Sequence, residues 1–262
     1  MTSLVLSAWP DTWTRERRCT ATMVAAAVVL VLFMWLVAVP LAWVPEPIGP
    51  AAQQFAEGTR VTVQLTVVSG LLGVAVGVLA ALGKLSSFGP FRWAASFYIW
   101  AIRGTPLLVQ VLFVFLALPM MVPSLQLSDF NSAALALAFN VGAYNAEAIR
   151  AGIQATPKGQ TEASRSLGLS PLQTFRDVVF PQSFKIALPP LVNNIVALLK
   201  DSSLAYVIGV VELSNIGNRV QAATFQPVPV FVATASIYLM LTSVLTQISG
   251  AIEARLNVEQ RH

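Results

Sequence analysis

The sequence contains few of the residues on which disulfide-stabilised proteins and metalloenzymes depend. Cys19 is its one cysteine and His262 its one histidine, so no disulfide forms within the chain. Without a pair or trio of Cys and His residues, structural metal binding and metal catalysis are both disfavoured. The terminal position of His262 leaves no histidine base inside a fold for hydrolysis or a proton relay. An enzyme whose catalysis depends on histidine or on a bound metal is therefore a remote alternative for this chain, including an enzyme that acts within a membrane.

Charge is also scarce. Charged residues make up 11% of the chain and hydrophobic residues 56%, with a mean hydropathy of +0.70. About 20 apolar residues cover the hydrocarbon layer of a bilayer, and six segments approach this length: 21–44, 61–83, 93–118, 132–149, 186–210 and 228–252. Because backbone polar groups must be paired within lipid, segments of this length predict helices. The expected fold class is an all-α, polytopic helical membrane protein.

The basic residues predict how these spans are oriented. Arg15, Arg17 and Arg18 precede the first apolar run, as in a secretory signal peptide, but the run is too long and lacks a clear cleavage site. We expect a retained span. Loops on the cytoplasmic side are enriched in Lys and Arg. With six spans and both ends in the cytoplasm, 12 of the 16 basic residues lie inside, Arg60 and Arg219 outside, and Arg103 and Lys200 within spans. The basic balance then needs no nucleic acid as partner.

The segments between the spans differ in character. Residues 45–59 and 119–131 are Pro-containing and almost free of positive charge, which is typical of outer connectors. Residues 150–185, on the cytoplasmic side, are numerous enough to form structure of their own. Thr156 as N-cap and Pro157 at the first helical position predict a helix over 158–167, with Gly168 as its left-handed terminator.

A second short helix is expected directly after Gly168. Ser170, Pro171 and Gln173 form the pattern of a capping box, and Pro181 should prevent continuation. Each short helix has an apolar edge, with Ala163 and Leu167 on the first and Phe175 and Val179 on the second. These edges require a partner, which is either the protein's own helical bundle, the membrane surface or another protein.

Residues 162–181, EASRSLGLSPLQTFRDVVFP, resemble the signature loop of the inner-membrane permeases of ATP-binding cassette importers. The match lies at Glu162, Ala163, Gly168 and Pro181. The sequence departs from that pattern at Ser164, Val178 and Phe180, where small or apolar character is kept. The resemblance implies that this loop couples the permease to a separate ATPase through Glu162, Ala163, Ser164, Gly168, Phe175 and Pro181.

Further motifs are similar to the polar amino acid subfamily of these permeases, which includes the histidine, glutamine, glutamate and arginine types. They are Arg103-Gly104-Thr105-Pro106, Gly142-Ala143-Tyr144 with Ala146-Glu147, Pro157-Lys158-Gly159-Gln160, and the run from Leu199 to Leu204. The resemblance covers residues 58–252, the expected five-span permease domain with its cytoplasmic loop 150–185. The span 21–44 is then an extra element without an assigned transport role, and 1–20 and 253–262 are cytoplasmic tails.

Polar residues inside the spans suggest a path for solute. Counted at about 1.5 Å per residue, Arg103, Asn140 and Lys200 share one layer near the middle of the membrane. A charge there costs roughly 2.5–3.5 kcal/mol on insertion scales, so such residues usually face protein or water. Gly104 and Pro106 predict a break in the third span that faces a cavity.

We therefore expect six polar residues on or near a translocation path, where the carboxylate and ammonium of an amino acid find opposite charges: Arg103, Thr105, Asn140, Lys200, Asp201 and Ser202. The alternative for each is a structural pair between helices. Glu147, near the inner end of the fourth span, is either a gate residue or an anchor for the loop, and we favour the anchor.

The sequence contains no ATP site of its own. Its Gly83-Lys84 pair lacks the remaining residues of a phosphate-binding loop. The resemblance implies that ATP and magnesium bind a cytoplasmic ATPase dimer, and that this chain binds no cofactor. The other implied partners are a second, identical or related permease, an extracytoplasmic solute-binding protein, membrane lipid and a polar amino acid. The implied location is a prokaryotic inner membrane, and the implied direction is import. A secondary transporter or channel is the nearer alternative.

Overall fold

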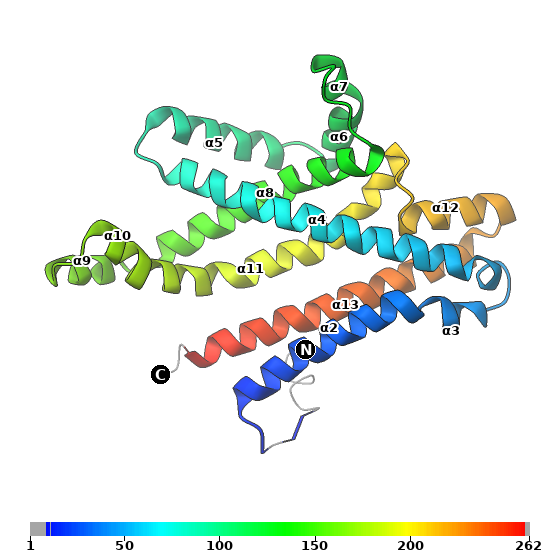
Figure 1. Ribbon diagram of the computed structural model, residues 1–262, viewed down its shortest axis with the longest axis horizontal. Helices are drawn as coiled ribbons and strands as arrows, with labels where there is room; N and C mark the ends of the chain where they lie inside the picture. The colour runs from blue at the N-terminus through cyan, green and yellow to red at the C-terminus, as the bar shows by residue number, and fades with distance from the viewer. Residues whose placement is uncertain (1–8, 11, 260–262) are drawn as a thin grey trace. The chain divides into compact units, whose positions relative to one another are not determined.

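A computed structural model of the chain describes residues 9–10 and 12–259, and all regular elements in this part are helical (Figure 1). The predicted all-α class is confirmed. The predicted tails 1–20 and 253–262 extend beyond the described residues, and His262 lies outside them. Contacts divide the chain into two compact units. The first unit takes its residues from Met1–Val67, Val111–Ala134 and Val196–His262, and the second from Val68–Gln110 and Leu135–Ile195.

In the first unit, α2 (Arg15–Leu36) and α13 (Pro227–Glu259) lie side by side (Figure 1). The core of this unit consists of apolar side chains from segments far apart in sequence, including Phe55, Leu199 and Leu241, and Phe33 of α2 packs against it. This burial supplies the main stabilisation. The extra helix predicted at 21–44 is thus an integral part of the unit.

Polar contacts join both ends of α2 to the same unit. Arg255 Nη2 donates to Glu16 Oε1 at 2.8 Å near the start of the helix. Near its end, Arg60 Nε donates to the carbonyl oxygen of Met34 at 3.2 Å, and the guanidinium lies 5.2 Å from the centre of the Trp35 ring. The contact with Trp35 is a cation–π interaction. Arg60 therefore holds the end of α2.

In the second unit, α4 (Ala52–Leu85) and α8 (Asp129–Ala155) approach closely. A Cβ atom added to Gly77 would lie 2.6 Å from Cβ of Asn145, and one added to Gly73 would lie 2.2 Å from Cγ1 of Val141. Real side chains do not approach so closely. Small residues at this crossing are typical of helix pairs in membranes, and here the absence of a side chain at Gly73 and Gly77 allows the backbones of α4 and α8 to lie close together.

Four helical segments in the described part are long and apolar enough to cross a membrane: Arg15–Ala42, Gly49–Leu85, Pro171–Ile208 and Pro227–Leu256. A fifth crossing is available if Gly89–Arg103 and Leu107–Met121, bent by 111°, count as one span. The bend falls at residues 104–106, so the predicted break is confirmed. The segment 132–149 lies within α8, and the total of six spans stays a prediction.

The predicted connectors carry more helix than expected. Within 45–59, the 3₁₀ turn Gly49–Ala51 leads directly into α4 at Ala52. Within 119–131, α7 (Leu118–Met121) and the start of α8 leave only a short link. The segment after α11 (Phe180–Asp201) and the 3₁₀ helix Ser202–Ile208 contains α12, Leu213–Thr224. The apolar residues of α12 recur with helical period and are buried: Leu213, Ile216, Gly217 and Val220.

Candidate functional site

The signature loop forms a hairpin, defined here as residues 158–179 of the second unit. Its first arm is α9 (Lys158–Ser166), and its second arm is α10 (Pro171–Gln173) with the π-helix η3 (Thr174–Val179). Gly168 has φ +84°, a left-handed conformation that glycine adopts without steric cost. Its N–H donates to the carbonyl of Arg165, and that of Leu169 donates to Ser164. The predicted terminator at Gly168 is confirmed.

The predicted caps give mixed outcomes. Ser170 and Gln173 form the expected capping box, with Gln173 N 3.3 Å from Ser170 Oγ and Ser170 N 2.9 Å from Gln173 Oε1. The expected cap by Thr156 is wrong, because Pro157 occupies the cap position and no side chain caps the helix. The Thr156 side chain is buried instead, and its Oγ1 has no hydrogen-bond partner among the described residues.

The prediction that Pro181 ends the second helix is also wrong. Pro181 is the second residue of α11, and the helical run continues from Pro171 to Ile208. Pro181 lies inside this run and lacks the N–H that a helix interior uses, but it closely follows the π-helix Thr174–Val179. The π-helix immediately before it changes the local hydrogen-bond register, which is a frequent arrangement at functional sites. The second arm is therefore the beginning of a long helix.

Apolar side chains at the tip of the hairpin are exposed. Leu167 is 84% exposed and Leu172 is 75% exposed, on either side of Gly168. Phe175 and Phe180 are also exposed, and their rings lie 6.1 Å apart. Of the remaining predicted coupling residues, Glu162, Ala163 and Pro181 are exposed and Ser164 is buried. The hairpin thus presents apolar groups on a polar segment, as an interaction surface does.

Three of the predicted path residues surround the break in the second unit. Arg103 ends α5 (Gly89–Arg103), and its guanidinium lies 5.2 Å from the centre of the Tyr144 ring. Thr105 Oγ1 donates to the carbonyl of Ala101 at 2.8 Å. Asn140, on α8, donates from Nδ2 to Gln110 Oε1 at 2.9 Å. The expected cavity at this break stays a prediction.

Gln110, on α6 (Leu107–Leu112), is the residue that sequence reasoning missed here. Its Nε2 lies 2.7 Å from the carbonyl oxygen of Ile102, 3.1 Å from that of Thr105 and 2.9 Å from Thr105 Oγ1. These acceptors lie where the break interrupts the regular helix, so Gln110 provides donors that the backbone lacks. A single amide side chain in the apolar run one turn after Pro106 was the available signal.

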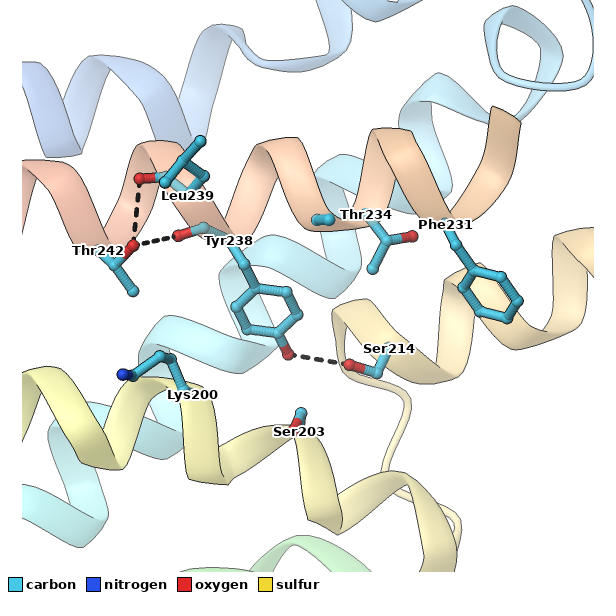
Figure 2. Close-up of a pocket in the computed structure, with 9 residues that line it drawn as sticks. Lys200, Ser203, Ser214, Phe231, Thr234, Tyr238, Leu239 and Thr242 are labelled. Carbon is cyan, nitrogen blue, oxygen red and sulfur yellow. Dashed lines mark hydrogen bonds between the residues drawn. The ribbon is translucent and has the colours of Figure 1, made fainter. Parts of the chain in front are cut away.

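In the first unit, Lys200 lines a cavity with a volume of about 590 Å³ (Figure 2). Ser203 lies on the same wall as Lys200, Tyr238 and Phe231 come from α13, and Ser214 comes from α12. Thr234, Ala235, Leu239 and Thr242 complete the lining. This volume is within the usual range for small-molecule sites. One ammonium and several hydroxyls among apolar walls suit a small solute that carries an anionic group.

Asp201 and Ser202, the neighbours of Lys200, do not line this cavity. Asp201 is half-buried, and Ser202 is fully buried with its Oγ donating to the carbonyl of Leu199 at 2.7 Å. Ser202 therefore meets its hydrogen-bonding need within its own helical turn and not through a pair between helices, and its place on the path stays a prediction. The role of Asp201 stays a prediction.

Glu147 lies in an ion cluster of the second unit. Its carboxylate accepts from Lys84 Nζ of α4, and from Arg150 Nε at 2.9 Å and Nη2 at 2.6 Å. Arg150 also contacts Gln154. Lys84 lies on α4, so its contact with Glu147 joins α4 to α8, whereas Arg150 lies on α8 with Glu147. The role of Glu147 as anchor or gate stays a prediction.

Glu212 is a buried carboxylate that sequence reasoning missed. It is 0% exposed and accepts from Thr62 Oγ1 at 3.3 Å, Tyr238 Oη at 2.8 Å and the N–H groups of Ser214 and Asn215, both at 2.9 Å. It thereby caps α12 and joins α4 to α13. Burial raises the pKa of Glu212, while these hydrogen bonds oppose the rise. The Tyr238 hydroxyl also lies 3.1 Å from Ser214 Oγ, so the cluster borders the cavity.

Comparison with known proteins gives a consistent result. Residues 73–258 match the family of binding-protein-dependent transport system inner membrane components, so α2 lies outside the match. The arginine transport system permease protein ArtQ of Bacillus subtilis is 38% identical over 200 residues, 76% of this chain and 91% of the relative. The glutamine transport system permease protein GlnP of Escherichia coli is 36% identical over 211 residues, 80% of this chain and 96% of the relative.

Two solved structures have similar folds. A chain from the crystal structure of an amino acid ABC transporter with histidines has 37% sequence identity and a TM-score of 0.74, covering 79% of this chain and 95% of that one. A chain of the inward-facing MetNI methionine ABC transporter has a TM-score of 0.61 over 80% of this chain and 99% of its own length. At 19% identity, the latter is evidence for the fold alone.

Proposed function

Because this chain belongs to the family of binding-protein-dependent transport system inner membrane components, we propose that it is the membrane permease of an ATP-driven importer for a polar amino acid. The observation that carries the proposal is the hairpin. Its exposed Leu167 and Leu172 flank the left-handed Gly168, inside the segment that matches the family. A secondary transporter or channel would not need such a surface.

The hairpin docks on a partner ATPase, which binds ATP and magnesium; the permease itself binds neither. Leu167, Leu172 and Phe175 supply apolar contacts, and Glu162 and Ala163 are exposed on the first arm, α9. Closure of the ATPase dimer moves α9 and the second arm, which continues into α11, the helix that carries Lys200. Alternating access follows from this movement.

The cavity beside Lys200 receives the solute. The Lys200 ammonium attracts the carboxylate of an amino acid, and the hydroxyls of Ser203, Ser214 and Tyr238 are available to the remaining polar groups. Arg103, Thr105 and Asn140 belong to the path at the break between α5 and α6, and Asp201 belongs to it as the neighbour of Lys200 in the chain. The arginine and glutamine named for the relatives make a polar amino acid the expected solute class.

The chain spans a prokaryotic inner membrane with both termini in the cytoplasm. A second permease, identical or related, completes the path, and an extracytoplasmic binding protein delivers solute. The outer face is expected to include α12, which carries Arg219. The predicted domain division, with 58–252 as the permease domain and 21–44 as an added span, is part of the proposal.

Affinity purification in mild detergent from the native membrane tests the proposal. We expect the wild-type chain to recover an ATP-binding subunit, identified by mass spectrometry. Gly168→Asp should recover much less, because an aspartate at φ +84° is strained. Gly159→Ala, on the same arm where an added Cβ meets nothing within 4 Å, is the matched control. Wild type recovered without any ATPase would contradict the proposal.

Uptake assays test the solute path in variants that insert and assemble normally. Lys200→Met should raise the solute concentration for half-maximal uptake by about tenfold or more, since a charged hydrogen bond contributes roughly 1.5–3 kcal/mol. Arg219→Met, an exposed cation that does not line the cavity, is the control. Unchanged uptake kinetics in Lys200→Met would remove this residue from the path.

A further inference from the structure

The interior of the hairpin contains two hydroxyl side chains. Ser164 is 5% exposed and Thr174 is 2% exposed, and within the described range 158–179 they are the two buried residues. One lies on α9 and the other begins η3, so they come from opposite arms. Apolar side chains of the same segment, such as Leu167, point to the surface instead. The arms therefore meet through polar groups.

The two hydroxyls are hydrogen-bonded to each other. Ser164 Oγ lies 3.2 Å from Thr174 Oγ1 and 2.9 Å from the carbonyl oxygen of Thr161. The N–H of Thr174 donates to the carbonyl of Ser170 at 2.8 Å. The Ser164 hydroxyl is thus held within its own arm, and the backbone of Thr174 is held within the other. A hydrogen bond depends on distance and angle, whereas apolar contact is not directional, so this pair defines the angle between the arms more narrowly than apolar packing would.

The turn between the arms has little packing of its own. A Cβ atom added to Gly168 would meet nothing within 4 Å, and Leu167 and Leu172 are exposed. Beyond the pair, the second arm continues without interruption into α11, as part of the helical run from Pro171 to Ile208. A link at Thr174 therefore joins α9 to the beginning of that long helix.

We infer that Ser164 and Thr174 are positioning residues that transmit movement of the docked α9 arm into α11. This inference rests on the proposed function. The pair itself does not contact the ATPase, because both side chains are buried inside the hairpin; the exposed residues dock, and the hydroxyl pair converts docking movement into helix movement. Loss of the pair leaves docking intact and allows α9 to move without α11.

The test uses the transporter purified with its ATPase and binding protein, reconstituted in proteoliposomes. The variants are Ser164→Ala and Thr174→Val, each of which removes one hydroxyl. Thr174→Ser keeps the hydroxyl and is the conservative variant. Ser166→Ala is the matched control, because Ser166 lies on the same helix, is exposed, and donates only to the carbonyl of Glu162. Solute transported per ATP hydrolysed is measured together with the amount of ATPase bound.

We expect both hydroxyl-deleting variants to bind the ATPase normally and to transport roughly two- to tenfold less solute per ATP, the factor that one net hydrogen bond contributes to an equilibrium. Thr174→Ser and Ser166→Ala should match wild type. Unchanged transport per ATP in both Ser164→Ala and Thr174→Val would overturn this inference but not the proposed function. So would a loss confined to ATPase binding, which would assign the pair to assembly. Wild type recovered without an ATPase would overturn the proposed function as well.

Discussion

The carboxylates of Glu147, on α8, and Glu212, at the start of α12, both accept several hydrogen bonds, but their partners and their exposure differ. Glu147 is partly exposed and contacts two cations, Lys84 and Arg150. Glu212 is fully buried, and its four described donors are hydroxyls and backbone N–H groups. Charge pairing thus stabilises the first carboxylate near solvent, whereas several neutral donors stabilise the second in the interior.

The difference bears on mobility as well as stability. An ion pair at a partly hydrated position can exchange its partners for water at low cost. A buried carboxylate cannot, because losing its donors leaves the desolvation of the charge uncompensated. We therefore expect Glu212 to hold α4, α12 and α13 in one fixed arrangement, and Glu147 to form a weaker connection between α4 and α8.

Glu212→Ala should give the largest effect. It removes a helix cap worth about 1 kcal/mol and an acceptor for the hydroxyls of Thr62 and Tyr238, each worth about 1–3 kcal/mol when buried. We expect the melting temperature of the purified protein in detergent to fall by several degrees. The melting temperature of Glu212→Gln, which keeps one carbonyl oxygen as acceptor, should fall less than that of Glu212→Ala. A melting temperature equal to wild type for Glu212→Ala would show that the cluster contributes little.

The pH dependence of stability should separate the two glutamates further. Burial raises the pKa of Glu212 above its ordinary value, so the folded state binds more protons than the unfolded state between these values. Protonation of Glu212 therefore adds to the free energy of unfolding. This contribution is complete below the ordinary pKa of a glutamate and is lost as pH rises through the raised pKa of the folded state. The slope is at most about 1.4 kcal/mol per pH unit. Melting curves from pH 4 upward, compared with Glu212→Gln, test this; identical slopes for the two proteins would contradict it.

Glu147→Gln should give the smallest of the three effects. Lys84 and Arg150 are each 28% exposed and remain partly hydrated when the carboxylate is lost, so we expect a destabilisation of about 1 kcal/mol. Asp177→Asn is the comparison at an exposed position, where Arg176 Nε donates to Asp177 Oδ1 at 2.7 Å. That variant should melt like wild type. A larger fall in melting temperature for Glu147→Gln than for Glu212→Ala would show that the ion cluster of Glu147 is the stronger of the two connections.

Some features of the site could be predicted because their causes are local. The left-handed turn at Gly168 and the capping box of Ser170 and Gln173 involve residues only a few positions apart. The break at 104–106 likewise follows from a glycine and a proline close together. Local signals also failed where the fold competed with them. Thr156 is buried instead of capping α9, and Pro181 lies within the helical run from Pro171 to Ile208, where the π-helix before it changes the hydrogen-bond register.

The sequence by itself determined the membrane class, since scarce charge and long apolar runs are properties of composition. It also determined the family, through the motif at 162–181. Only the tertiary structure decided the partners of Glu212, which include Thr62, 150 residues away, and the pairing of Ser164 with Thr174 between two arms of a hairpin. The physical reason is that composition and turn chemistry act along the chain, whereas a buried polar side chain takes its partner from whichever segment packing brings near.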